Sequence, residues 1–272
     1  MPHITQLAAV ELETGSTFNT YILPKIPITE EAMNITGIVV DSDLLNMTVN
    51  GNKVNALPIT SGLTDFLQWL KRFSNVTLVA HNGRRFDFPV LMNTLLSLNL
   101  TNVLLSAVSG FIDSITVFKK AFPEQNNYQQ ETLVKTILNT TYGAHDATED
   151  IKTLRMLLKQ TKFSSSDLLS FSFPPLAVHH SLLFSKEKSK NITSLHVLIT
   201  YGVVKYNTAE NIAGSGLNYS HLYKIFKRDG EDGLRAAFSQ NNCDGQPRVS
   251  ATKRLLDSVV PKLVEYFEKH EQ

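Results

Sequence analysis

Acidic side chains that could bind a divalent cation fall in three separated segments of this 272-residue chain. Glu11 and Glu13 lie in the first segment, Asp87 in the second and Asp150 in the third. Hard cations such as Mg²⁺ prefer oxygen ligands, and few proteins gather four carboxylates at one place without a cation. If folding brings the segments together, they predict a site for two such ions.

Each acidic segment lies where a strand or helix is expected to end or begin. Residues 11–14 follow the apolar run 7–10, which we expect in the centre of a sheet, and the strand period of two places both glutamates on one face. The polar stretch 81–89 directly follows the apolar run 76–80, which predicts a buried strand. Polar turns at the carboxyl edge of an α/β sheet are common places for functional sites.

The third segment adds a histidine to the acids. His145 opens a helix predicted over 145–159, and Asp150 lies five residues later, so both side chains can face one cleft. Asp113, which follows another predicted strand, is a lesser candidate, because Asp before a helix is typical of an N-cap residue. The third segment therefore brings a titratable ring and a carboxylate toward one place.

Three motifs follow one another along the chain: Glu11-x-Glu13, His81-Asn82-Gly83-x-x-Phe86-Asp87-x-Pro89-x-Leu91 and His145-x-Ala147-x-x-Asp150. Their residues and order resemble the motifs of the DEDDh family, the ribonuclease-H-like 3′→5′ exonucleases. The second motif, with Asp113-Ser114-Ile115-Thr116, is similar to the TREX branch, and the resemblance covers roughly residues 5–160. With the helical tail that follows, the chain also resembles the exonuclease-like C-terminal region of PML and its stand-alone relatives in fish.

The resemblance implies a mechanism and assigns roles to residues. Two Mg²⁺ or Mn²⁺ ions would be held by Glu11, Glu13, Asp87 and Asp150. His145 would take the proton from the attacking water, a task that suits an ordinary histidine pKa near 6.5, and the product would be a nucleoside 5′-monophosphate. The nucleic acid would be contacted near its terminal nucleotide by Leu12, Thr14, Asn82, Arg84 and Arg85.

The chain departs from the family in its first motif. Glu11 stands where the family has Asp, and only Thr14 separates Glu13 from Gly15, where the family usually has one more residue. The proline-rich insertion of the TREX branch is not visible, so partner binding by that route is not carried over. Asp146 stands where the tyrosine variant of the family would need Tyr, which excludes that variant.

These observations predict a metal-dependent 3′→5′ exonuclease that acts on DNA, preferably at single-stranded ends. Two alternatives stay open. In the first, permitted by the altered first motif, an exonuclease fold has lost turnover and serves as a nucleic-acid-binding or protein-interaction module. In the second, an exoribonuclease, the reaction is the same but the substrate is RNA instead of DNA. The expected partner is DNA with a 3′ end. RNA and a second copy of the chain, in a homodimer, are further candidates, and no membrane partner is expected.

The amino-acid composition limits how the protein can contact nucleic acid and indicates its cellular compartment. The 26 basic and 25 acidic residues give a net charge of +1, so contacts with phosphate must be local. One cysteine cannot close an internal disulfide, and no Cys/His cluster has the spacing of a zinc site. The N-terminus lacks the pattern of a signal peptide, and no segment approaches 18 uninterrupted apolar residues. We therefore expect an intracellular protein, nuclear or cytoplasmic.

Strands followed by alternating strands and helices predict an α/β fold, a ribonuclease-H-like mixed sheet flanked by helices and followed by a small all-α domain. Strands are expected over 4–13 and 18–23, as a hairpin turning at 14–16, and over 76–80 and 103–112. Helices are expected over 61–73, 86–98, 114–121, 129–138, 145–159, 194–206, 219–228, 231–239 and 255–267.

The composition changes after Lys162, where Ser-rich, Pro-Pro and mixed-charge stretches follow one another. We therefore expect an exonuclease-like domain over 1–162, a loosely packed linker over 163–192 and a helical C-terminal domain over 193–272.

Overall fold

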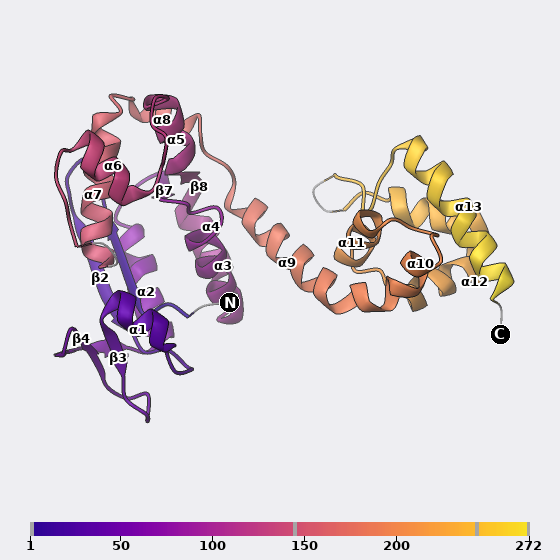
Figure 1. Ribbon diagram of the computed structural model, residues 1–272, viewed down its shortest axis with the longest axis horizontal. Helices are drawn as coiled ribbons and strands as arrows, with labels where there is room; N and C mark the ends of the chain where they lie inside the picture. Colours follow the sequence, from indigo (N-terminus) through magenta and orange to yellow (C-terminus); the bar gives the residue numbers. More distant parts are fainter. Residues whose placement is uncertain (1–2, 144–145, 243–244, 271–272) are drawn as a thin grey trace. The chain divides into compact units, whose positions relative to one another are not determined.

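The computed structural model describes residues 3–143, 146–242 and 245–270, and the chain divides into two compact units, Met1–His179 and His180–Gln272 (Figure 1). The first unit has small sheets flanked by helices, and the second is helical. This arrangement agrees with the expected mixed α/β fold followed by an all-α region.

The described strands of the first unit form three small sheets. In the first sheet β1 (Gln6–Val10) pairs antiparallel with β2 (Thr17–Ile22), which pairs parallel with the short β6 (Ala56–Leu57). In the second sheet β3 (Ile38–Val40), β4 (Met47–Val49) and β5 (Asn52–Val54) run antiparallel.

The third sheet is the one that matters most for the site. In it β7 (Val76–Ala80) pairs parallel with β8 (Val108–Asp113), and Ala80 lies opposite Asp113. Because the strands are parallel, their carboxyl ends meet at one edge.

The expected positions of β1 and β7 are only partly correct. Every residue of both strands is half-buried, because β1 lies at the edge of its sheet and β7 pairs with β8 alone among the described strands. The apolar run 7–10 therefore does not lie in a sheet centre. Its strand also ends at Val10, earlier than the predicted end at residue 13.

Eight helices lie wholly within the described residues of the first unit, between or after these strands. They are α1 (Glu30–Thr36), α2 (Ile59–Leu70), α3 (Asp87–Ser97), α4 (Thr101–Ala107), α5 (Ser114–Ala121), α6 (Gln130–Ile137), α7 (Ala147–Gln160) and α8 (Ser165–Leu169). Apolar residues at helical spacing predict the inner faces well: α2 buries Leu63, Phe66, Leu67 and Leu70, and α7 buries Leu154, Leu157 and Leu158.

The strand expected over 103–112 is wrong in its first half. Residues 101–107 form α4, and the strand begins only at Val108. The sequence of α4 carries Leu104, Leu105 and Ala107, which are good helix formers, and Leu104 is fully buried. A short apolar run of this kind suits a buried strand or a buried helix equally, so its pattern alone does not decide.

The stretch expected as a loose linker over 163–192 is instead largely helical. Ser164 begins α8 with a capping box, in which its side chain and that of Asp167 exchange hydrogen bonds with backbone N–H groups. Further along, Phe173 forms two backbone hydrogen bonds of 2.9 Å with Phe111 of β8. The serine-rich composition thus marks a helix start, and the segment through Phe173 belongs to the first unit.

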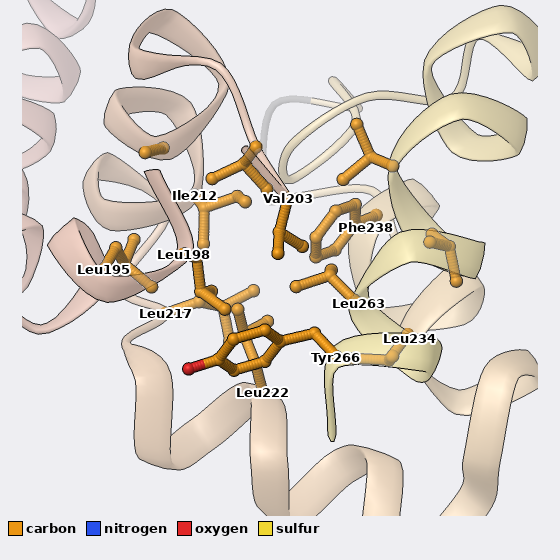
Figure 2. Packing of buried hydrophobic residues seen from close by; sticks show 14 of the residues in the cluster. Leu195, Leu198, Val203, Ile212, Leu217, Leu222, Leu234, Phe238, Leu263 and Tyr266 are labelled. Atoms are coloured by element: carbon orange, nitrogen blue, oxygen red, sulfur yellow. The ribbon is translucent and has the colours of Figure 1, made fainter. Parts of the chain in front are cut away.

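The second unit contains helices packed around one apolar core. After α9 (Pro175–Asn191), which begins in the first unit, come the 3₁₀ helix η1 (Ile192–Leu195), α10 (His196–Thr200), α11 (Tyr206–Gly214), α12 (Tyr219–Ser239) and α13 (Lys253–Lys269). Figure 2 shows part of this core, in which Leu198, Leu222, Phe238 and Leu263 are fully buried.

Two expectations for these helices have different outcomes. The single helix expected over 194–206 is divided, because Gly202 adopts a φ of 67° in the turn after α10. The break expected at Gly230 is confirmed, since φ is 61° there and the helix on either side is separate. In the described part of the chain, no helix combines the length and the apolar character needed to cross a membrane.

The segment after residue 162 should be required for the stability of the first unit. Leu168 is buried in the core around α7, and Phe163 and Phe171 pack against that core. Each large apolar side chain that loses its burial costs about 1.5–3 kcal/mol. We therefore expect the fragment 1–162 to aggregate or unfold, whereas the fragment 1–179 remains folded in circular dichroism and size-exclusion chromatography. A stable, monomeric 1–162 fragment would contradict this assignment.

Candidate active site

The loop that carries the second motif begins beside the start of α5. Because Ala80 lies opposite Asp113 at the end of the parallel strand pair, the residues that follow β7 and β8 leave the sheet at the same edge. The first residue of the loop, His81, places its Nδ1 2.9 Å from the Ser114 hydroxyl. Burial lowers the pKa of His81 and outweighs the hydrogen bond with the Tyr128 backbone and the attraction of Asp113, so the ring is favoured in its neutral form.

The Asp113 side chain connects this loop to α5. Its carboxylate accepts a hydrogen bond from the backbone N–H of Arg84 at 3.1 Å and another from that of Ile115 at 3.0 Å. The expectation that Asp113 is an N-cap is therefore confirmed, because the bond from Ile115 caps α5. The hydrogen bond from the Arg84 N–H was not expected from the sequence. It fixes the loop of the second motif against α5.

Backbone conformation also shapes the loop. Asn82 adopts the left-handed conformation, with a φ of 55°. A Cβ atom on Gly83 would lie 2.6 Å from the Cβ of Ala80 and 2.7 Å from the ring of Phe88, so only glycine permits this close approach. The tight packing brings the chain directly into α3, whose first residue is Asp87.

Three carboxylates from separate segments influence one another electrostatically. The Asp87 side chain is exposed, but protein atoms surround its carboxylate closely enough to reduce its hydration. This desolvation, with smaller repulsion from Asp113 and Asp150, raises the pKa of Asp87 to about 6. The fold therefore brings Asp87 and Asp150, two of the four predicted ligands, into electrostatic contact and adds Asp113 to them.

The first turns of α7 are fixed by several hydrogen bonds. Asp146 is the N-cap and accepts from the backbone N–H of Thr148 at 2.8 Å. Gln130 of α6 donates to the backbone carbonyl of Asp150 at 2.7 Å. Tyr142 forms a hydrogen bond with the Asp150 carboxylate, and burial together with that negative charge raises the pKa of the phenol. The predicted base, His145, lies outside the described residues.

The first motif does not have the expected arrangement. Because β1 ends at Val10, residues 11–14 form a turn, and the strand period that would place Glu11 and Glu13 on one face does not apply. The Glu11 carboxylate accepts hydrogen bonds from the backbone N–H groups of Glu13 and Thr14 and from the Thr14 hydroxyl. The bond from that hydroxyl is the main cause that lowers the pKa of Glu11. Glu11 thus caps its own turn, while Glu13 is exposed.

The predicted nucleic-acid contacts have different surroundings. The guanidinium of Arg84 lies 3.8 Å from the centre of the Phe173 ring, in a cation–π contact. Arg85 and Thr14 are exposed, whereas Leu12 and Asn82 are half-buried. Within the residues that the structure describes, no three His, Cys, Asp or Glu side chains lie close enough together to hold a metal ion.

The sequence did not indicate the residues that connect α7 to β1 and to the turn of the first motif. Arg155 of α7 donates to the backbone carbonyls of Leu12 at 2.8 Å and Glu13 at 2.9 Å. Gln6 of β1 accepts from the backbone N–H of Ala147, at the start of α7. A single arginine or glutamine on an amphipathic element gives no signal in the sequence, because solvated side chains of the same type are common there.

Comparisons with known proteins agree with this architecture. Residues 2–158 match the family model described as Exonuclease, and residues 191–270 match the model described as PML, C-terminal domain. The chain is 25% identical over 225 residues to a DNA polymerase III PolC-type of Caldanaerobacter subterraneus subsp. tengcongensis. That alignment covers 80% of the chain but only 14% of the polymerase.

The exonuclease match covers more than half of the chain, so this protein belongs to the exonuclease family, a family of nucleases that act on nucleic acids. The resemblance to that family and to PML, drawn from three motifs and a helical tail, is confirmed at this level. The two matches leave residues 159–190 between them, the stretch that contains α8 and most of α9.

Asp87→Asn should stabilise the metal-free protein at neutral pH. Because the pKa of Asp87 is raised in the folded state, the folded protein binds this proton more tightly than the unfolded chain, and stability decreases as pH rises from about 4 to about 6. Removing the charge should therefore raise the free energy of unfolding at pH 7.5 by about 1 kcal/mol, allowing for solvent screening, and by much less at pH 4.

The measurement is urea denaturation in EDTA at both pH values. Asp65→Asn, at an exposed position of α2 outside the site, is the matched control and should show no such pH-dependent gain. A loss of stability in Asp87→Asn at pH 7.5 would show that burial and the neighbouring charges do not destabilise the ionised carboxylate as described.

Proposed function

We propose that this protein is a metal-dependent 3′→5′ exonuclease that releases nucleoside 5′-monophosphates from DNA, preferably from single-stranded ends. The observation that supports it most is the grouping of carboxylates around Asp87 near the carboxyl edge of the β7–β8 sheet, where burial and, to a smaller extent, the charges of Asp113 and Asp150 raise the pKa of Asp87 to about 6. Such a cluster is unfavourable alone and is relieved by a divalent cation. The match to the exonuclease family over residues 2–158 supports nuclease chemistry for this cluster.

The donor set fits two Mg²⁺ or Mn²⁺ ions in kind, because all of its members are carboxylates. Asp87 and Asp150 would hold these ions together with Glu11 and Glu13 of the first motif. For this, the Glu11 carboxylate has to leave the hydrogen bonds within its turn. When bound, the ions would activate a water molecule and stabilise the leaving 3′-oxygen.

The residues of the chain would then perform the remaining steps. His145 would accept the proton of the attacking water at a ring nitrogen, for which its ordinary pKa is suited. Asp113, through its bonds to the backbone of Arg84 and Ile115, would keep the loop of the second motif in place as substrate enters. Asn82 and Arg85 in that loop, with Leu12 and Thr14 in the turn of the first motif, would contact the terminal nucleotide.

Two observations support DNA as substrate and a local contact surface. The relative from Caldanaerobacter subterraneus subsp. tengcongensis is a DNA polymerase by its name, and its alignment covers 80% of this chain. The net charge of +1 provides no general attraction for phosphate, so a few residues at the end of the strand must hold it. The single cysteine fits a reducing compartment, nuclear or cytoplasmic.

A second candidate function follows from the arrangement of the first motif. The Glu11 carboxylate is occupied by its own turn, and in the described part of the chain no metal cluster is formed. These features favour an exonuclease fold that binds nucleic acid or a protein without turnover. Release of a mononucleotide product that depends on added metal would distinguish the exonuclease from a module that only binds.

Digestion of a 5′-labelled single-stranded DNA should give a descending ladder in Mg²⁺ or Mn²⁺, and EDTA should abolish it. A 3′-labelled strand should release a labelled mononucleotide at once, because cleavage begins at the 3′ end. Asp87→Asn and His145→Ala should each lower the rate by at least about 10²-fold. Binding of the strand without any product would select the second candidate, and faster digestion of a matched RNA strand would select an exoribonuclease.

Replacing Glu11 distinguishes a compensated active site from an impaired one. Asp is shorter than Glu by one methylene, about 1.5 Å of reach. If the turn has adjusted to the longer side chain, Glu11→Asp and Glu11→Gln should both lower the metal-dependent rate, and we expect this result. A higher rate in Glu11→Asp, with a smaller requirement for Mn²⁺, would show instead that Glu11 weakens the site. Glu31→Asp, at an exposed position of α1, is the control.

A further inference from the structure

The side chain of Arg155 connects α7 to the turn of the first motif. Its Nε donates to the carbonyl of Leu12 at 2.8 Å, and its Nη2 donates to the carbonyl of Glu13 at 2.9 Å. Two parallel donors on a planar guanidinium define both the distance and the orientation of the group that they hold. The backbone on both sides of Glu13 is therefore fixed relative to the middle of α7.

Several other polar groups of the turn form hydrogen bonds within the turn itself. The N–H of Glu11 donates to the carbonyl of Ser16 at 2.8 Å, and the N–H of Gly15 donates to the carbonyl of Glu11 at 3.1 Å. The Glu11 carboxylate accepts from Glu13 and Thr14. These bonds close the loop on itself, and the bonds from Arg155 attach the closed loop to the rest of the unit.

Gly15 provides the space for this attachment. A Cβ atom at Gly15 would lie 3.2 Å from Nη2 of Arg155, and the residue has a φ of 76°. The guanidinium therefore lies directly against the glycine backbone. Gly51 has nearly the same φ, 79°, but nothing lies within 4 Å of the corresponding position.

The helix also holds β1 at a second point. Gln6 accepts from the backbone N–H of Ala147, eight residues before Arg155 and about 12 Å along the helix. Asp150 lies between these two attachment points. One rigid element thus carries the carboxylate of the third motif and sets the position of the segment that carries the first.

We propose that Arg155 is a positioning residue that fixes Glu11 and Glu13 relative to Asp150. This inference rests on the proposed exonuclease function. The first motif has a longer acid at residue 11 and a turn shorter by one residue than the resembled family, so its backbone needs an attachment of its own. Arg155 reaches the two carbonyls in the middle of that short turn and provides it.

The decisive experiment measures exonuclease rate against Mg²⁺ concentration in the full-length protein. Arg155→Ala should raise the half-saturating Mg²⁺ concentration roughly tenfold or more, as expected when a residue that orients metal ligands is lost. It should lower kcat and leave the KM for the oligonucleotide nearly unchanged. Arg155→Lys keeps the charge and can bond only one carbonyl in this geometry, so it should give an intermediate shift and also serves if the alanine variant does not fold.

Lys152→Ala is the matched control, because Lys152 lies on the same helix and its ion pair with Glu149 is exposed. It should leave the Mg²⁺ dependence unchanged. A merely structural role for Arg155 would lower the melting temperature and leave the Mg²⁺ requirement and the kcat of the folded protein at wild-type values. That result in both Arg155 variants would overturn the proposal.

A second perturbation approaches the contact from the other side. Gly15→Ala should crowd the guanidinium and reproduce the Mg²⁺ shift, whereas Gly51→Ala introduces a similar backbone strain without that contact and should not. Equal effects of the two glycine variants on Mg²⁺ dependence would contradict the proposal.

Amide hydrogen exchange separates this proposal from the proposed function. In Arg155→Ala, the amides of residues 11–15 should exchange at least about tenfold faster, while those of β2 keep their protection. If the wild-type protein has no nuclease activity, the proposed function fails, and the exchange result still decides whether Arg155 fixes the turn. Unchanged exchange would overturn the positioning role even in an active enzyme.

Discussion

A nearly buried carboxylate at the end of a parallel strand pair sets the geometry on which the site depends. Asp113 is only 7% exposed, and a carboxylate in such a place is stable when N–H groups donate to it. Its two bonds go to different elements, the loop after β7 and the start of α5. Since β7 and β8 are in register at Ala80 and Asp113, one side chain determines how both segments leave the sheet.

The same constraint creates electrostatic strain nearby. Once the loop is fixed, α3 begins with Asp87 close enough to Asp113 and Asp150 for their charges to act on it. If the proposed metal site lies here, folding and function make opposite demands on these side chains. Neutral side chains would be more stable there, but only ionised carboxylates can attract a divalent cation.

Much of the fold could be predicted from the sequence. Apolar spacing identified the inner faces of α2 and α7, the turn at Gly15 identified the hairpin of β1 and β2, and Gly230 marked the break in α12. These features are local, because they depend on periodicity or on the φ of one residue. The helix α4 could not be distinguished from a strand, since a short run of Leu and Val residues satisfies both patterns.

The candidate site shows the same division between local and long-range information. The motifs identified Asp87 and Asp150, and the order Asp-Ser identified Asp113 as a cap. The bond from Asp113 to Arg84 spans 29 residues and that from Arg155 to Leu12 spans 143, and no local pattern indicates such partners. The turn of Glu11 was missed because it depends on where β1 ends, which the strand pattern placed too late.

The contact between Arg155 and the short turn also limits which changes in sequence the first motif can tolerate. An arginine on α7 is useful to the first motif only while the turn keeps its carbonyls within reach, and a longer turn would move them. If Arg155 positions the turn as proposed, an insertion before Gly15 would therefore remove the two acceptors of its hydrogen bonds, although the two positions lie far apart in the sequence. The arginine and the short turn then depend on each other, because a change at either position removes the advantage of the other.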